Sequence, residues 1–168
     1  MSFEKSAHEA FLGLGCHCIL EPKEGKGGLY LSNLKKAEDI PHLLSLNISA
    51  MVSVMEDDPP ESLCELLNIK NLYIDVLDAP SSRLIDYFEV SSNFIKKELT
   101  RGNVQVHCHM GVSRSATLVI AFLMRENRKS AKEAIGIVRE RRSCILPNDG
   151  FLMQLQEYEE KLKKSHEN

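Results

Sequence analysis

The sequence predicts an α/β domain with a mainly parallel central sheet of about four to five strands, flanked by helices. The first observation is a set of four short apolar runs, each bordered by turn-forming or polar residues, as is typical of strands. These runs lie at residues 28–31, 50–54, 71–74 and 104–107. The second observation is helical periodicity between and after the runs. Strands that alternate with helices favour a parallel sheet in a single domain.

Each expected helix has its own support in the sequence. The run 115–126 is apolar on nearly every side, which predicts a helix in the middle of the fold. Ser130 opens a capping-box pattern, and Asn148 or Asp149 can cap the last helix. The expected helices cover residues 40–46, 84–99, 115–126 and 130–141, and a final segment after Asn148 or Asp149.

The bulk composition fits one ordinary domain. The chain has 168 residues, of which 43% are hydrophobic and 27% are charged, so it can bury a core without disulfides or a structural metal. Its formal net charge is only −3, which gives no reason to expect nucleic acid or a membrane as a partner. The oligomeric state is not indicated by these features.

The cysteines and the chain ends point to a reducing compartment. Residues 1–5 lack the apolar core of a signal peptide, and the apolar run 118–124 is far too short to span a bilayer. Five cysteines are present, an odd number that favours reduced thiols. A cytoplasmic location is therefore expected, with the nucleus as a second compartment.

The segment 104–115 carries the chemistry; it reads Val-Gln-Val-His-Cys-His-Met-Gly-Val-Ser-Arg-Ser and joins a buried strand to a buried helix. Such a junction points backbone N–H groups and the positive end of the helix dipole at one place, where phosphate fits. Gly111 permits tight curvature around the anion, and Arg114 can bind two phosphate oxygens. The same positive charges favour the thiolate form of Cys108, which makes it the candidate nucleophile.

Neighbouring residues in this segment are expected to support the nucleophile. Ser115 can donate a hydrogen bond to the sulfur and help it to leave, and His107 is expected to hydrogen-bond the backbone behind the loop. An inert buried Cys108 is the alternative, as for most lone cysteines, but the surrounding pattern argues against it. The residues expected to contact the substrate are His109, Met110, Gly111, Val112, Ser113 and Arg114.

Residues 104–123 resemble the signature of the dual-specificity protein phosphatases, within the protein tyrosine phosphatase superfamily. Further stretches that resemble this family lie at residues 28–33, 84–95 and 147–152. The resemblance implies a protein tyrosine phosphatase-like catalytic domain over 28–162, after a partly packed N-terminal segment 1–27 and before a C-terminal tail 163–168. It implies hydrolysis of phosphotyrosine and phosphoserine or phosphothreonine on proteins through a cysteinyl phosphate, with no cofactor and no metal.

Family chemistry also requires an aspartic acid that protonates the departing oxygen and then activates water. The candidates are Asp75, Asp78 and Asp86. Asp75 directly follows a predicted strand, and Asp86 lies on the following helix. Asp78 lies on the loop itself, at the spacing before Phe88 that the resembling proteins show. Asp78 is therefore the favoured acid, and a plain turn aspartate is its alternative reading.

Two weaker patterns leave alternatives open. Arg139, Arg141 and Arg142 form a basic cluster at an expected helix end. The cluster is either a solvated helix end, where cations suit the dipole, or a secondary anion site that binds substrate, with Arg142 as its best candidate. The Cys-His-Cys run at 16–18 could suggest a metal site. Without a second such cluster, an unstructured or packed N-terminal segment is favoured.

Two other functions compete with a protein phosphatase. The chain contains no tryptophan, whereas the tyrosine-specific relatives carry one on the acid loop, so a shallower site that also admits phosphoserine is favoured. A phosphoinositide phosphatase would usually carry lysines inside the loop, and this loop has none. A module that holds phosphorylated partners without turnover would typically lack the cysteine or the arginine, and both are present.

Overall fold

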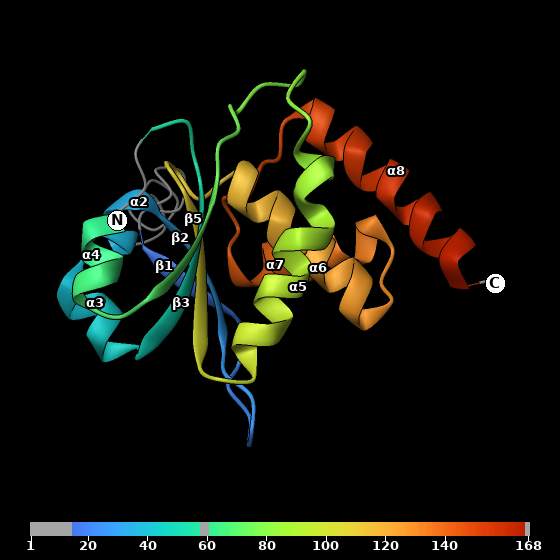
Figure 1. Ribbon diagram of the computed structural model, residues 1–168. Helices are drawn as coiled ribbons and strands as arrows, with labels where there is room; N and C mark the ends of the chain where they lie inside the picture. Colours follow the sequence, from blue (N-terminus) through green and yellow to red (C-terminus); the bar gives the residue numbers. More distant parts are fainter. Residues whose placement is uncertain (1–14, 58–60, 167–168) are drawn as a thin grey trace, which may run out of the picture.

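The structure, a computed structural model, describes residues 15–57 and 61–166. Within these residues the chain forms one five-stranded sheet with helices on both faces (Figure 1). The strands are β1 (Cys16–Leu20), β2 (Leu29–Asn33), β3 (Ile48–Val54), β4 (Lys70–Ile74) and β5 (Asn103–Cys108). The helices are α2 (Leu34–Ala37), α3 (Ile40–Ser45), α4 (Glu61–Leu66), the 3-10 helix η1 (Leu84–Tyr87), α5 (Phe88–Leu99), α6 (Arg114–Asn127), α7 (Ala131–Arg141) and α8 (Asp149–His166).

The sheet confirms the predicted α/β class. Its strand order is β1-β2-β5-β3-β4, in which β1 and β2 are antiparallel and the other neighbours are parallel. The four predicted apolar runs correspond to β2, β3, β4 and β5. Sequence analysis missed β1, because Ile19 is the one fully buried residue of this edge strand and no apolar pattern results. It also missed the short helices α2 and α4, which have four and six residues.

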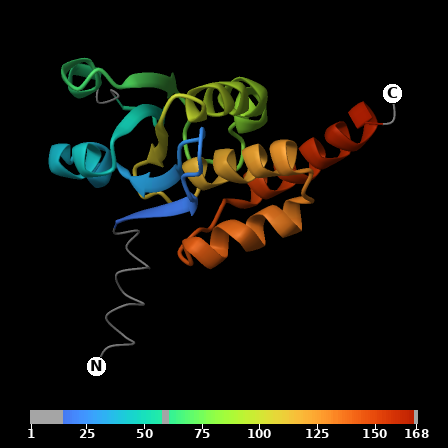
Figure 2. The same ribbon diagram turned by 90° about the horizontal axis from the view of Figure 1, so that it is seen from below.

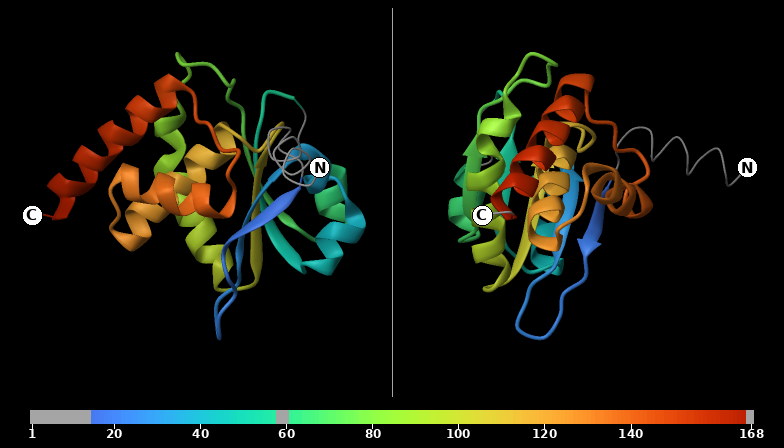
Figure 3. Two further views of the ribbon diagram at one scale, coloured as in Figure 1. Left: turned by 180° about the vertical axis from the view of Figure 1, so that it is seen from behind. Right: turned by 90° about the vertical axis from the view of Figure 1, so that its right-hand side faces the viewer.

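Helices cover the sheet as one layer on each face. α2, α3 and α4 lie on one face, and α5, α6, α7 and α8 lie on the other (Figures 1 and 3). The C-terminal end of α8 extends beyond this second layer (Figure 2). Strand side chains alternate between the faces, so Leu31, Val52 and Val106 join the α6 side while Tyr30 and Met51 join the α3 side. No helix in the described ranges is long and apolar enough to cross a bilayer.

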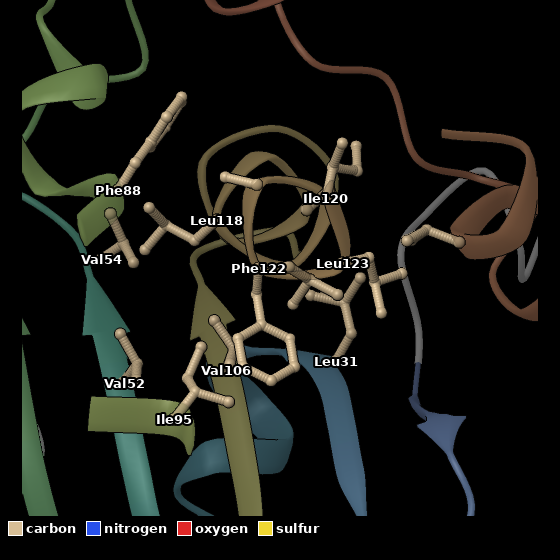
Figure 4. Packing of buried hydrophobic residues seen from close by; sticks show 14 of the residues in the cluster. Leu31, Val52, Val54, Phe88, Ile95, Val106, Leu118, Ile120, Phe122 and Leu123 are labelled. Carbon is tan, nitrogen blue, oxygen red and sulfur yellow. The ribbon is translucent and has the colours of Figure 1, made fainter. Parts of the chain in front are cut away.

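α6 is the central helix of the larger core, as its apolar sequence predicts. Every residue from 114 to 124 is buried. Leu118, Phe122 and Leu123 pack among side chains of the sheet and of α5 (Figure 4). Burying one large apolar side chain stabilises the fold by roughly 1.5–3 kcal/mol. The N-terminus of α6 is therefore held firmly in front of β5.

Side-chain caps set the start of the last two helices. Ser130 Oγ accepts the backbone N–H of Glu133 at 3.2 Å, and the Glu133 carboxylate accepts the backbone N–H of Ser130 at 2.8 Å. This reciprocal pair is the predicted capping box. Asn148 Oδ1 accepts the backbone N–H of Phe151 at 3.0 Å. Asn148, rather than Asp149, therefore caps α8.

The parallel strands end at one edge of the sheet, and β5 passes into α6 at this edge. β5 lies between β2 and β3, and Cys108 at its end is in register with Asn33 at the end of β2. The connection from β4 to η1 passes over the same edge (Figure 1). Open α/β sheets bind their ligands at this edge, so the fold brings the predicted loop and the predicted acid to one place.

Candidate active site

Cys108 lies at the end of β5, directly below the N-terminus of α6. The residue is only 2% exposed. Its Sγ accepts the backbone N–H of Gly111 at 3.2 Å and lies 3.0 Å from Ser115 Oγ. Both groups can donate a hydrogen bond to a thiolate, and the dipole of α6 adds positive potential at the same point. The surroundings of Cys108 therefore suit a nucleophilic sulfur.

The loop of residues 109–113, called the 109–113 loop below, curves tightly over the sulfur. Gly111 adopts a φ of +66°, in the left-handed region that favours glycine. A Cβ at this position would lie 2.4 Å from the carbonyl oxygen of Ser32. Any side chain here would push the loop away from the sheet, which explains why the sequence has glycine at this point.

Arg114 is the first residue of α6, and its side chain turns toward the edge of the sheet. It is 4% exposed. Its Nη1 contacts the Glu56 carboxylate and donates to the carbonyl oxygen of Val76 at 3.1 Å. Its Nε is buried and has no hydrogen-bond partner among the described residues. Glu56 and Val76 thus fix the guanidinium. The Nε–H remains available as a donor, and because a buried N–H without an acceptor is costly, an oxyanion bound there would be stabilised.

Asp78 reaches the 109–113 loop from the β4–η1 connection. Its Oδ1 accepts the Ser113 hydroxyl at 2.8 Å and the Asn148 side-chain amide at 2.8 Å. Of the two other candidates, Asp75 is exposed directly after β4. Asp86 is exposed and pairs with Arg83, which lowers the pKa of Asp86. Of the three candidates, Asp78 is the one whose carboxylate the described contacts join to the loop.

His107 directly precedes Cys108 in β5, so its side chain lies on the opposite face of the sheet. It is fully buried, and its Nε2 lies 2.7 Å from Ser53 Oγ, its register partner on β3. Ser53 Oγ donates to Asn71 Oδ1 at 3.0 Å, so the Nε2 of His107 must be the donor to Ser53. Burial lowers the pKa of His107 to about 4. Ser53 is thus a side-chain partner of His107, in addition to the backbone interaction at Cys108.

The remaining residues of the 109–113 loop take different places. Met110 is half exposed, and His109 Nε2 lies 2.9 Å from Asp57 Oδ2. The carbonyl oxygen of Val112 accepts the backbone N–H of Leu146 at 2.9 Å. Substrate contacts by these residues stay a prediction.

Arg142 corrects the prediction of a second anion site. Its side chain is 1% exposed, so it is neither a solvated cation nor a group at the surface that could bind substrate. Its guanidinium donates to the carbonyl oxygens of Gly111 and Met110 on the inner side of the 109–113 loop. Arg139 and Arg141 are the exposed residues of the cluster, and Arg141 pairs with Glu21 at 3.2 Å.

The other cysteines differ from Cys108 in their surroundings. All five cysteines are unpaired thiols. Burial raises the pKa of Cys16 to about 12 and the pKa of Cys18 and Cys64 to about 11. These three thiols therefore stay protonated at neutral pH and are poor nucleophiles.

Sequence analysis missed Glu56 and Asn148 as site residues. Glu56 lies just beyond β3, at the same edge of the sheet as Cys108, and holds Arg114. Asn148 was predicted as a helix cap, and it also binds Asp78 through its side-chain amide. The position of Glu56 after a strand was the available signal, since strand ends gather at this edge. No local pattern predicts the second contact of Asn148, which depends on tertiary packing.

Comparison with known proteins agrees with this geometry. Residues 29–161 match the family model of the dual specificity phosphatase catalytic domain. Dual specificity protein phosphatase 22 of Homo sapiens is 41% identical over 133 residues, which cover 79% of this chain and 70% of that protein. Tyrosine-protein phosphatase yvh1 of Schizosaccharomyces pombe is 39% identical over 131 residues, which cover 77% of this chain and 39% of that protein.

The fold agrees with solved structures as well. The crystal structure of human DUSP28 superimposes with a TM-score of 0.77 at 26% identity, over 88% of this chain and 95% of that chain. The family model spans most of this chain, and its span includes Asp78, Cys108 and Arg114. The chain therefore belongs to the dual specificity phosphatases, hydrolases of the protein tyrosine phosphatase superfamily.

Proposed function

We propose that the chain hydrolyses phosphotyrosine and phosphoserine or phosphothreonine on proteins, with Cys108 as the nucleophile. The observation that carries the proposal is the position of the Cys108 sulfur. It lies within hydrogen-bond reach of the Gly111 N–H and of Ser115 Oγ, at the N-terminus of a buried helix. A phosphoryl group above this sulfur would meet the inward N–H groups of the 109–113 loop and the Nε of Arg114.

In the first step the Cys108 thiolate attacks phosphorus. A sulfur–phosphorus bond forms while the bond from phosphorus to the substrate oxygen breaks. The departing oxygen takes a proton from the carboxyl group of Asp78, so the side chain of the substrate protein leaves with a neutral hydroxyl group. Arg114 and the loop N–H groups stabilise the charge that collects on the oxygens of the transferred group. Ser113 and Asn148 hold the Asp78 carboxylate against the loop.

In the second step water attacks the cysteinyl phosphate. Asp78, now a carboxylate, accepts a proton from the water, and the sulfur–phosphorus bond breaks to release inorganic phosphate. Ser115 donates a hydrogen bond to the departing sulfur, over a separation that is 3.0 Å in the structure. No metal or cofactor takes part in these steps, since Arg114 and the backbone supply the positive charge.

Charge around the loop supports protein substrates over phosphoinositides. His109 lies beside Asp57 and within 3.8 Å of Glu56, so this side of the site is acidic. Arg114 is the only lysine or arginine in the segment from Cys108 to Ser115. An inositol ring with several phosphates would be repelled by this arrangement, whereas a single phosphorylated side chain needs one anion site.

The proposed partners are phosphorylated proteins, rather than nucleic acid or a membrane. The proposed location is the cytoplasm or the nucleus. Five unpaired thiols support a reducing compartment, and the net charge of −3 supports neither a nucleic acid nor an anionic membrane as a partner.

Phosphate release from a matched pair of peptides, one with phosphotyrosine and one with phosphothreonine, tests this function. The assay includes a chelator, and Cys108→Ser is the control. We expect release from both peptides and none by the variant. Release from phosphotyrosine alone would contradict the dual specificity, and release from a phosphoinositide but from neither peptide would overturn the protein-phosphatase proposal.

A further inference from the structure

The guanidinium of Arg142 lies beneath the 109–113 loop and faces its backbone carbonyls. Nε donates to the carbonyl oxygen of Gly111 at 2.8 Å, and Nη2 donates to the carbonyl oxygen of Met110 at 3.2 Å. A Cβ on Gly111 would lie 2.8 Å from Nη2, so the loop backbone rests on the guanidinium. The planar fork of arginine suits two neighbouring acceptors, which a lysine cannot bind in the same way.

These two bonds fix the direction of the peptide groups in the loop. A peptide unit is planar, and its C=O and N–H point in opposite directions. When Arg142 binds the carbonyls of Met110 and Gly111 from below, the N–H groups of the same two peptide units, which belong to Gly111 and Val112, turn toward the Cys108 side. The Gly111 N–H does donate to Cys108 Sγ, at 3.2 Å. The inward direction of the loop N–H groups, which an oxyanion requires, therefore depends on a side chain outside the loop.

His17 in β1 holds the other end of the guanidinium. Nη1 of Arg142 lies 2.7 Å from His17 Nδ1 and donates to the carbonyl oxygen of Gly15 at 3.3 Å. Because arginine can only donate, Nδ1 of His17 must be the acceptor, and the ring is neutral. Burial, and to a lesser extent the charge of Arg142, lowers the pKa of His17, in agreement with a neutral ring. His17 lies upstream of the matched family region, which begins at residue 29.

We propose that Arg142, oriented by His17, is a positioning residue that keeps the N–H groups of the 109–113 loop turned toward the phosphoryl group. This inference rests on the proposed function, because it assigns a task in binding the phosphoryl group. It explains why an arginine is fully buried beside a nucleophile that it does not touch. It also gives β1 a role in the site, although β1 lies at the far edge of the sheet from β4.

The test uses inorganic phosphate as the probe and p-nitrophenyl phosphate as the substrate, so that no protein substrate is needed. For Arg142→Lys we expect the Kd for phosphate and the KM to rise by roughly tenfold or more, by analogy with the loss that follows when residues that orient metal ligands are mutated. Arg141→Ala is the matched control, because Arg141 is exposed and bound to Glu21, and it should leave both constants unchanged.

A pair of His17 variants keeps the test independent of the folding of the Arg142 variant. His17→Asn retains a side-chain acceptor for Nη1, so it should preserve most of the phosphate affinity. His17→Leu removes the acceptor and should weaken phosphate binding several-fold. Equal phosphate affinity in these two variants would overturn the role of His17.

Two further outcomes are separable. If Arg142→Lys lowers Tm but leaves the phosphate Kd and KM of the folded protein unchanged, Arg142 is merely structural and the inference is wrong. If the wild-type protein neither binds phosphate nor hydrolyses p-nitrophenyl phosphate, the proposed function itself is wrong. The inference about Arg142, which rests on that function, then fails with it.

Discussion

Three side chains surround the Cys108 sulfur and the proposed position of the phosphoryl group. Ser115 contacts the sulfur at 3.0 Å, Arg114 presents a buried Nε, and Asp78 is fixed to the loop through Ser113. In the proposed reaction, Ser115 assists the departure of the sulfur, Arg114 stabilises charge and Asp78 transfers the proton. Removing one of them should therefore change one step more than the others.

Asp78→Asn removes the proposed proton donor while keeping the size of the side chain. We expect kcat on phosphopeptides to fall by about 10²–10⁴-fold, the usual contribution of a general acid. The loss should be smaller on p-nitrophenyl phosphate, because its leaving group needs little protonation. Steady-state kinetics on both substrates measure the difference. Asp75→Asn is the matched control, and an equal loss in this variant would contradict the assignment of Asp78.

Ser115→Ala removes the hydroxyl that we propose assists the departing sulfur. We expect the second step to slow by roughly tenfold or more, since a donor to a developing anion contributes a few kcal/mol. The first step should proceed, so stopped-flow traces with p-nitrophenyl phosphate should show a burst followed by a slow phase. A single slow phase without a burst would argue against this role.

At the scale of elements, the site depends on the junction of β5 with α6. β5 places Cys108 at the end of a central strand, and the core holds α6 in place through side chains such as Leu118 and Phe122. The 109–113 loop fits between them because Gly111 approaches the carbonyl of Ser32 more closely than any Cβ allows.

Gly111→Ala should damage this junction. The added Cβ would lie 2.4 Å from a backbone oxygen, at a φ of +66°. We expect kcat/KM to fall by more than about tenfold and the free energy of unfolding to drop by roughly 1–3 kcal/mol. Denaturant unfolding and kinetics with p-nitrophenyl phosphate measure both effects.

Gly136→Ala in α7 is the matched control for that substitution. Nothing lies within 4 Å of a Cβ at this position, so alanine should stabilise the helix by about 0.5–1 kcal/mol and leave activity unchanged. Equal behaviour of the two alanine variants would show that the 109–113 loop can relax and that the close approach of Gly111 does not matter.

At the scale of the whole molecule, burial of neutral histidines links stability to pH. His107 has a folded pKa of about 4, against an ordinary value of 6.5, because burial disfavours its charged form. The unfolded chain takes up a proton as pH falls below 6.5, whereas the folded protein does not. Burial also lowers the pKa of His17 and His42, so these residues act in the same direction.

The free energy of unfolding should therefore fall as pH drops from 7 to 5. The total loss by pH 4 should be on the order of a few kcal/mol. Urea unfolding at several pH values measures it, and the window above pH 5 separates the histidines from the carboxylates. His107→Gln should flatten the dependence. A free energy of unfolding that stays constant from pH 7 to 5 would contradict a buried neutral His107.

The sequence was sufficient for the features that local patterns determine. The four apolar runs and the all-round apolar helix predicted the parallel sheet and α6, and Ser130 predicted a capping box. The segment around Cys108 predicted the loop, because strand, glycine and arginine are adjacent in the chain. The place of Asp78 beside this loop needed the family spacing in addition.

Contacts between segments that lie far apart in the chain could not be predicted from the sequence. Basic residues surround Arg142 in the sequence, so it was interpreted either as part of a solvated helix end or as part of a secondary anion site. Tertiary packing instead buries it against a loop and a strand far away in the chain. Glu56 was overlooked because nothing near it in the sequence indicates Arg114 as its partner. Sequence patterns report which face of an element is buried, but they do not identify the partner of a buried charge.

The most direct test of the central claim is to trap the cysteinyl phosphate. The protein is mixed with excess p-nitrophenyl phosphate and quenched within the burst, preferably as Ser115→Ala to lengthen the lifetime of the intermediate. Digestion and mass spectrometry should then find one phosphoryl group on the peptide that contains Cys108, and Cys108→Ser should abolish turnover. Turnover by Cys108→Ser, or a phosphoryl group on another residue, would contradict Cys108 as the nucleophile.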